Sequence, residues 1–145
     1  MTTSRQFASS IVINQTTLWV IGGSSPSLET STEYIDIVLG TSTIGPELPC
    51  ALLPHAHVSL NHSVSMIIGG CLSNHALTFY FNQQSQQWTP GPQLIEGREG
   101  HSAGLYINQT NDEQFIVVSG GLDNHGNVID SVEILNVAEN KWSKG

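Results

Sequence analysis

Residues 115–121 read FIVVSGG, an apolar run rich in β-branched residues that is closed by a pair of glycines. This composition favours a short buried strand, and the glycines mark the point at which the strand stops. Residues 18–23 (LWVIGG) and 66–70 (MIIGG) repeat the arrangement. Strands that end in the same way indicate an internal repeat, so the spacing between them decides which fold the chain adopts.

Each of these strands follows another short run that ends at an asparagine. The asparagines are Asn14, Asn61 and Asn108, which recur at equal intervals. The third hairpin turn, residues 108–114, holds the extra residues that lengthen the last interval between glycine pairs. A strand-rich period of roughly 40 to 50 residues is typical of propeller blades, whereas helical repeats need a 3.6-residue periodicity that is absent from this sequence. We therefore predict an all-β fold built from hairpins.

A third strand and a tryptophan complete the unit. Trp88 and Trp142 follow their third strands at the same spacing, and each supplies the large apolar area that fills the space between packed sheets. The first unit has only Thr41 or Ser42 at this position. Trp19, in the glycine-closed strand of that unit, is expected to be buried between blades.

This order of features resembles the kelch repeat, in which an arginine or histidine precedes a hairpin, a glycine pair and a tryptophan strand. The resemblance covers nearly the whole chain as repeats of about 4–46, 50–92 and 98–144, within one domain of residues 1–145. It implies three four-stranded antiparallel blades of an incomplete β-propeller. The sequence departs from the pattern where Phe7 stands opposite His101, and where the polar Ser119 precedes the last glycine pair.

Residues 100–104 match the G-x-S-x-G pattern of a serine hydrolase. That motif needs a strand that turns sharply into a helix. Ser102 is followed instead by a strand, a turn and another strand, and the aligned units repeat no nucleophile. We therefore place Ser102 in the first strand of a blade and predict no catalytic residue.

His55 and His57 have the spacing that puts two side chains on one face of a strand, as a metal pair requires. A third ligand would have to come from elsewhere, such as His62 or His75, and no flanking motif supports a site. Residues 123–127 carry several oxygen-bearing side chains but fail the spacing of a calcium loop, so a tight turn is favoured. No metal site and no cofactor are predicted.

The chain has 145 residues, a net charge of −8 and only 11% charged residues, below the roughly 25% of typical domains. The few basic residues are scattered, which argues against nucleic-acid binding. No apolar run is long enough to span a membrane, and no signal peptide is recognised. The sequence leaves the compartment open, with an intracellular chain favoured over a secreted one.

Two further patterns bear on the compartment. Cys50 and Cys71 could pair across a hairpin or be two small buried thiols, and we favour the thiols. Asn14, Asn61 and Asn108 each begin an N-glycosylation sequon, but asparagine is also favoured in tight turns, and chance sequons are expected in a Ser/Thr-rich chain.

Loops that follow the glycine pairs are the expected site of function, because the sheets serve to hold them. The kelch resemblance implies a scaffold or adaptor that binds a protein partner of unknown identity. The alternatives are a fragment of a propeller enzyme, similar to copper oxidases or sialic-acid epimerases, and a truncated product without function. Because a propeller needs at least four blades to close, the chain is also expected to self-associate or to belong to a longer protein. The candidate binding residues are Ser24, Ser25, Asn74, His75, Asn124 and His125.

Overall fold

A computed structural model describes residues 3–24 and 30–145. These residues form three four-stranded antiparallel sheets and no helix. The strands are β1 (Ser9–Val12), β2 (Thr17–Ile21), β3 (Thr32–Asp36), β4 (Thr41–Ile44), β5 (Ala56–Ser59), β6 (Val64–Ile68), β7 (Thr78–Asn82), β8 (Gln87–Pro90), β9 (Ser102–Ile107), β10 (Gln114–Ser119), β11 (Val132–Asn136) and β12 (Lys141–Lys144).

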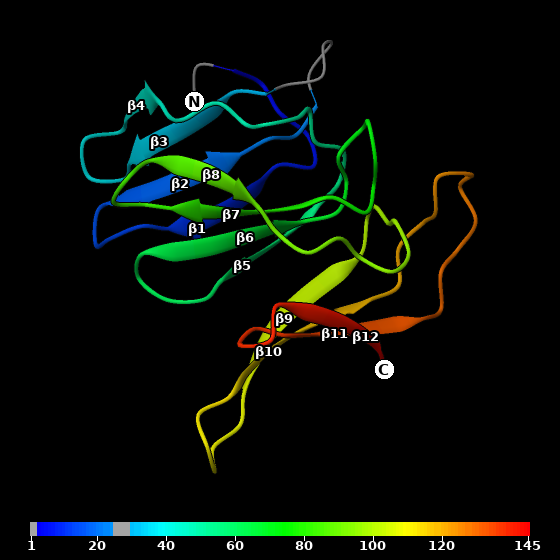
Figure 1. The fold of residues 1–145 in the computed structure, drawn as a ribbon. Helices are drawn as coiled ribbons and strands as arrows, with labels where there is room; N and C mark the ends of the chain where they lie inside the picture. The colour runs from blue at the N-terminus through cyan, green and yellow to red at the C-terminus, as the bar shows by residue number, and fades with distance from the viewer. Residues whose placement is uncertain (1–2, 25–29) are drawn as a thin grey trace.

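Each sheet is a simple meander in which every strand pairs with its neighbours in sequence. We call the sheets blade 1 (β1–β4), blade 2 (β5–β8) and blade 3 (β9–β12). Figure 1 shows them as successive layers, with the blades facing one another. The predicted class is confirmed: the fold is all-β and has the blades of an incomplete propeller.

Blades 1 and 2 pack through an aromatic cluster. Trp19 is fully buried, and its ring centroid lies 4.4 Å from that of Phe81 and 5.7 Å from that of Trp88. Tilted aromatic pairs at these distances stabilise beyond the area they bury. The expectation that Trp19 is buried between blades is confirmed.

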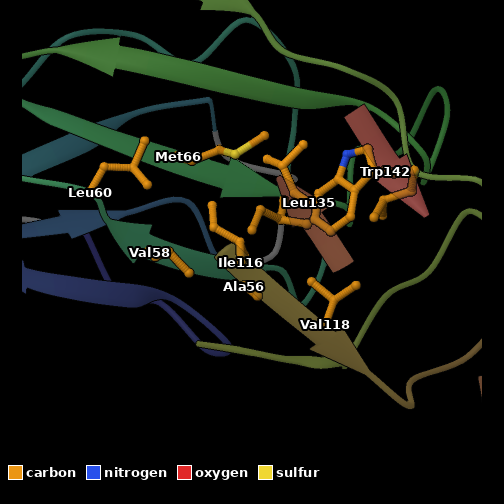
Figure 2. Packing of buried hydrophobic residues seen from close by; sticks show 10 residues of the cluster. Ala56, Val58, Leu60, Met66, Ile116, Val118, Leu135 and Trp142 are labelled. Carbon is orange, nitrogen blue, oxygen red and sulfur yellow. The ribbon is translucent and has the colours of Figure 1, made fainter. Parts of the chain in front are cut away.

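Blades 2 and 3 pack through aliphatic side chains. Figure 2 shows Val58 and Met66 of blade 2 pointing toward Ile116 and Leu135 of blade 3. Trp142 closes this cluster, and its Nε1 donates a hydrogen bond of 2.8 Å to the backbone oxygen of Pro92. The buried tryptophan N–H is therefore satisfied across the blade boundary.

The faces of blades 1 and 3 that point away from blade 2 remain partly uncovered. Val12 and Ile44 lie on that face of blade 1 and are 74% and 84% exposed. On blade 3 the corresponding face carries Tyr106, which is 57% exposed and stacks near Phe115. Ser42, not Thr41, occupies the tryptophan position of blade 1, because it pairs with Ile35 as Trp88 pairs with Phe81.

The glycine pairs make room for the residue that starts each blade. A Cβ on Gly69 would lie only 2.6 Å from the ring of His101, and a Cβ on Gly22 would lie 3.2 Å from the ring of His55. Both glycines also have a positive φ, which L side chains rarely adopt. Each blade-start histidine thus reaches across to the glycine pair of the preceding blade.

The aligned position in blade 1 is Ala8, not Phe7, so that part of the sequence alignment is wrong by one residue. Ala8 packs on Gly23 as His101 packs on Gly121. Phe7 has a φ of 60° and therefore takes the place of Gly100, whose φ is 62°. A left-handed residue in this position cannot be recognised from Phe7, because phenylalanine rarely adopts that conformation.

A disulfide joins Cys50 and Cys71, with their Cα atoms 6.0 Å apart. The preferred interpretation of two buried thiols is therefore wrong. Cys71 directly follows the glycine pair of blade 2, and Cys50 lies in the segment that leads from blade 1 into blade 2. The two cysteines meet at the open end of the β5–β6 hairpin, where Leu52 forms a β-bridge with Cys71, so the alternative of a pair across one hairpin is confirmed.

The hairpin turns and the long loops lie at opposite ends of the blades (Figure 1). The turns that join β1 to β2, β5 to β6 and β9 to β10 lie at one end, together with the turns before β4, β8 and β12; we call this the turn end. The loops that follow the glycine pairs, and the connections between blades, lie at the other; we call this the loop end.

Candidate functional site

The loop end carries a hollow of about 440 Å³ between blades 2 and 3. Three of the predicted binding residues meet there, Asn74 and His75 from blade 2 and Asn124 from blade 3. The hollow is lined by Leu53, Leu72, Ser73, Asn74, His75 and Asn124. Loops from neighbouring blades are thus brought together, as the repeat pattern predicts.

The other predicted residues lie apart from the hollow. Ser24 forms a β-bridge with Gln6 at the start of blade 1. Ser25 lies outside the described residues. The side chain of His125 is 84% exposed, and its Nδ1 lies 3.9 Å from Asp123 Oδ2. The structure therefore gathers half of the six candidates around one site.

A compact turn holds the blade 2 side of the hollow. The backbone N–H of Asn74 donates to the carbonyl of Cys71, and Asn74 Oδ1 accepts the N–H of Ala76 at 2.9 Å. The carbonyl of His75 accepts the backbone N–H of Arg98 at 3.1 Å. The position of His75 is therefore tied to the segment that starts blade 3.

The blade 3 side of the hollow is a tight turn at residues 123–127, as predicted in preference to a calcium loop. Asp123 Oδ1 accepts the backbone N–H groups of His125 and Asn127, both at 2.8 Å, and Gly126 supplies a φ of 79°. The side-chain hydrogen bond from Asn127 to Asp123, together with these backbone bonds, lowers the pKa of the Asp123 carboxyl. A negative charge is held beside Asn124 as a result.

Two acidic residues lie next to lining residues of the hollow. Asp123 precedes Asn124 on the blade 3 turn, and the buried Oε2 of Glu99 lies 4.0 Å from His75 Nε2. Arg98 lies next to Glu99 in sequence, but its side chain is fully buried and paired with Glu133 at 2.9 Å. Arg98 therefore presents no accessible positive charge beside the hollow.

Sequence reasoning missed Leu53, Leu72 and Ser73 as lining residues. Leu72 is 50% exposed although it is a large apolar residue in a loop directly after the disulfide. The only signal in the sequence is a leucine in the same loop as Asn74. A single apolar residue in a loop does not predict a binding site, because such residues are common on protein surfaces.

His55 and His57 do lie near each other, and His101 joins them at the neighbouring blade start. Burial lowers the pKa of each of these histidines to about 4, and the charges of nearby groups add to this for His57 and His101. Ser9 contacts His55 Nε2 at 2.7 Å. Within residues 3–24 and 30–145, no group of three or more His, Cys, Asp or Glu side chains is placed to hold a metal ion.

Ser102 is the first residue of β9 and pairs with Ser119 of β10. The G-x-S-x-G pattern therefore lies at the start of an inner strand and leads into no helix, as predicted from the residues that follow it. The described part of the chain also contains no helix that is long and apolar enough to cross a membrane.

Residues 116–145 match the kelch motif. The matched segment includes most of β10, all of β11 and β12, and the glycine pair of blade 3. No curated protein matches the chain. The motif and the three stacked antiparallel sheets together define the architecture as that of an incomplete kelch-type β-propeller. Kelch propellers are commonly protein-interaction folds, and the expected resemblance is confirmed at the level of motif and fold.

Proposed function

We propose that this chain is a protein-interaction module and that it binds its partner at the loop end. The observation that carries the proposal is the hollow between blades 2 and 3, where Asn74, His75 and Asn124 meet. Rigid sheets that hold loops of adjacent repeats around a shared concavity are the usual way in which repeat proteins form a binding surface.

The chemistry of the hollow favours a partner segment that is basic and carries an apolar side chain. Asp123 and Glu99 place negative charge next to the lining residues Asn124 and His75, and Leu72 lines the hollow with an exposed apolar side chain. The amide groups of Asn74 and Asn124 supply both donors and acceptors for a backbone or side chain of the partner. Charge complementarity of this kind raises the association rate and favours the correct partner.

The test is a differential capture experiment with purified protein and its variants. The double variant Leu72→Ala with Asn124→Ala removes an apolar and a polar contact from the hollow. We expect it to lose a partner that the native chain retains. Gln109→Ala, which changes an exposed residue of the turn end, is the matched control and keeps that partner. Equal capture by both variants would contradict binding at the hollow.

We propose no enzymatic activity for the chain. Two of the three tyrosine hydroxyls that a copper oxidase-like site could use connect blades instead: Tyr34 donates to Gln86 at 2.9 Å and Tyr80 donates to Asn140 at 2.8 Å, while Tyr106 is 57% exposed on blade 3. Both cysteines form the disulfide. Stoichiometric copper in the purified chain would revive the oxidase alternative, so metal analysis is the measurement that separates the two functions.

Self-association through the uncovered faces of blades 1 and 3 forms a second part of the proposal. The supporting observation is the exposure of Val12 and Ile44 on one face and of Tyr106 on the other. Light scattering coupled to size exclusion tests it, and a discrete dimer is the expected species. A monomer that binds no apolar dye would contradict it.

A further inference from the structure

We infer that Asn14, Asn61 and Asn108 are sites of N-linked glycosylation, which form one row along the turn end. Each lies at the turn between the first and second strands of its blade. Each begins an Asn-x-Ser/Thr sequon whose middle residue is not proline. The sequons end at Thr16, Ser63 and Thr110.

The backbone hydrogen bonds of these hairpins explain the asparagines but do not by themselves require the hydroxyl residues. Asn14 Oδ1 accepts the backbone N–H of Thr16 at 2.9 Å, and Asn61 Oδ1 accepts that of Ser63 at 2.8 Å. These bonds use a backbone N–H that any residue except proline supplies. The hydroxyls of Thr16 and Thr110 add a second bond to the asparagine oxygen, which supplements the backbone bond and does not replace it.

The turns before β4, β8 and β12 make the same kind of side-chain-to-backbone hydrogen bond without a sequon. Asp36 Oδ1 accepts the N–H of Val38 at 2.9 Å, and Asn82 Oδ1 accepts that of Gln84 at 2.9 Å. Blade 3 has Asn136 in the same role, with its Oδ1 accepting the N–H of Glu139. Two residues after Asp36, Asn82 and Asn136 stand Val38, Gln84 and Ala138, none of which has a hydroxyl.

The hydroxyl residue is thus present in every first hairpin and in none of these second turns. The two sets of turns lie at the same end of the same blades. They differ in backbone conformation, because the second turns contain a left-handed residue, Gly40, Gln86 or Asn140, and the first turns of blades 1 and 2 do not. The hydroxyls therefore follow the first-hairpin position, where each of them completes a sequon.

The exposure and the hydrogen bonds of the three asparagines are also compatible with glycosylation. Asn14 and Asn61 are exposed, and Asn108 is half-buried. Within the described residues the side-chain nitrogen of none of the three donates a hydrogen bond, since their oxygens make the turn contacts. The hydroxyls of Thr16 and Thr110 lie 3.2 and 2.7 Å from the asparagine oxygen of their own sequon.

The reaction needs a co-substrate of one chemical class, an oligosaccharide linked to a lipid pyrophosphate. The asparagine side-chain nitrogen forms a bond to the anomeric carbon of the sugar. The bond from that carbon to the pyrophosphate oxygen breaks, the lipid pyrophosphate leaves, and the nitrogen releases one proton. Atoms and electrons balance without an oxidant or a reductant.

The disulfide between Cys50 and Cys71 supports the same compartment independently. Disulfides persist in oxidising environments such as the secretory pathway and are rare in the reducing cytosol. N-glycans are added in that pathway as well. The loop end lies opposite the three asparagines, so glycans at the turn end leave the hollow accessible (Figure 1).

The test is a glycopeptide map of the chain isolated from the cells that produce it. Peptide N-glycosidase acting in ¹⁸O-labelled water converts each glycosylated asparagine to labelled aspartate, which mass spectrometry detects. Chymotrypsin is the suitable protease, because residues 6–97 contain no lysine or arginine. We expect labelled aspartate in place of Asn14, Asn61 and Asn108. Recovery of all three as unmodified asparagine would overturn the inference.

Variants assign each glycan and keep the backbone hydrogen bond of the turn. Thr16→Ala, Ser63→Ala and Thr110→Ala each remove a sequon hydroxyl but keep the N–H that the asparagine oxygen accepts, and each is expected to remove one glycan. Thr16→Ser keeps the hydroxyl and is expected to keep the glycan. If the alanine variants carry the same glycans as the native chain, the asparagines are not the sites. An unchanged melting temperature shows that the loss is not a folding effect.

Discussion

Blade 2 and blade 3 use different side chains to connect the start of the blade to the loop after its glycine pair. In blade 3, the buried Arg98 connects the start of the blade to the loop after its glycine pair. It donates to the carbonyls of Gly120 and Ser131 at 3.0 and 3.1 Å and pairs with Glu133. Blade 1 repeats this arrangement with Arg5, whose side chain is also buried and pairs with Glu33 at 3.3 Å.

Blade 2 has apolar residues at all three positions of this network. Leu52, Leu77 and Phe79 stand where blade 3 has Arg98, Ser131 and Glu133. The disulfide between Cys50 and Cys71 joins the same two segments covalently. A buried ion pair can often be replaced as a set by apolar residues, whereas loss of one partner leaves a buried charge. The comparison indicates that the three residues of this network can be replaced together by apolar residues but not one at a time.

The largest expected effect comes from breaking the blade 3 network at one point. Arg98→Leu leaves Glu133 buried without its cation and should lower the free energy of unfolding by about 3–5 kcal/mol. The triple variant Arg98→Leu, Ser131→Leu and Glu133→Phe copies blade 2 and should recover most of that loss. Urea unfolding measures both.

Lys141→Leu is the matched control for this prediction. It removes an exposed cation of blade 3 that pairs across the sheet with Asn136 and not with Glu133, and it should change the free energy of unfolding by less than about 0.5 kcal/mol. A single Arg98→Leu variant as stable as the native chain would show that the buried ion pair does not hold blade 3 together.

Removal of the blade 2 disulfide is expected to have the next largest effect. The bond closes a loop with a sequence separation of 21 residues, for which the chain-entropy relation gives about 3 kcal/mol. Urea unfolding of the Cys50→Ala, Cys71→Ala variant against the oxidised native chain measures this loss. Quantitative alkylation of both cysteines in the folded, non-reduced protein would show instead that the bond is absent.

Acid should destabilise the chain through its blade-start histidines. A histidine whose pKa falls to about 4 on folding binds fewer protons than the unfolded chain does between about pH 6.5 and 4. The stability that each neutral histidine contributes is therefore present above pH 6.5. It is lost as the pH falls through this window, by up to about 1.4 kcal/mol per pH unit for each histidine.

Blade 1 shows how to isolate one of these contributions, because Ala8 occupies its blade start and does not titrate. His101→Gln should make the dependence of unfolding free energy on pH shallower between pH 6 and 5, by about 1 kcal/mol. Urea unfolding at a series of pH values measures the slope. An unchanged slope would mean that His101 is not kept neutral by burial.

The smallest predicted effect concerns the residue before each blade start. Phe7 has the left-handed conformation that Gly100 adopts in blade 3, and it is 63% exposed, so its side chain contributes little burial. Phe7→Gly should raise the free energy of unfolding by about 1 kcal/mol, and Gly100→Ala should lower it by a similar amount. A loss of stability in Phe7→Gly would show that the phenylalanine makes a contact that outweighs its strain.

The repeat pattern predicts most of the fold, because glycine pairs and hairpin asparagines mark positions where the backbone permits few other residues. The pattern fails where the structure departs from its own repeat. Phe7 occupies a glycine position, so an alignment by residue type assigns it to the next position. The disulfide between Cys50 and Cys71 lies at the open end of the β5–β6 hairpin, a pairing that the sequence allows but does not favour over two thiols.

The candidate site is predictable in part for a similar reason. Asn74, His75 and Asn124 follow from the rule that loops after the glycine pairs lie at one end. Leu53 and Leu72 do not follow from it, because the hollow is a property of how two blades pack and not of either loop. Ser24 shows the converse, since its place after a glycine pair leads it into a β-bridge with Gln6.

The meander topology also has a consequence for synthesis of the chain on the ribosome. Every strand pairs with a sequence neighbour, so each sheet can form from a short stretch as soon as that stretch emerges. The face of blade 1 that carries Trp19 is not fully covered, however, until Phe81 and Trp88 have been made. During that interval a large aromatic surface is open to chaperones and to other nascent chains, and the speed of translation through blade 2 sets how long it stays open.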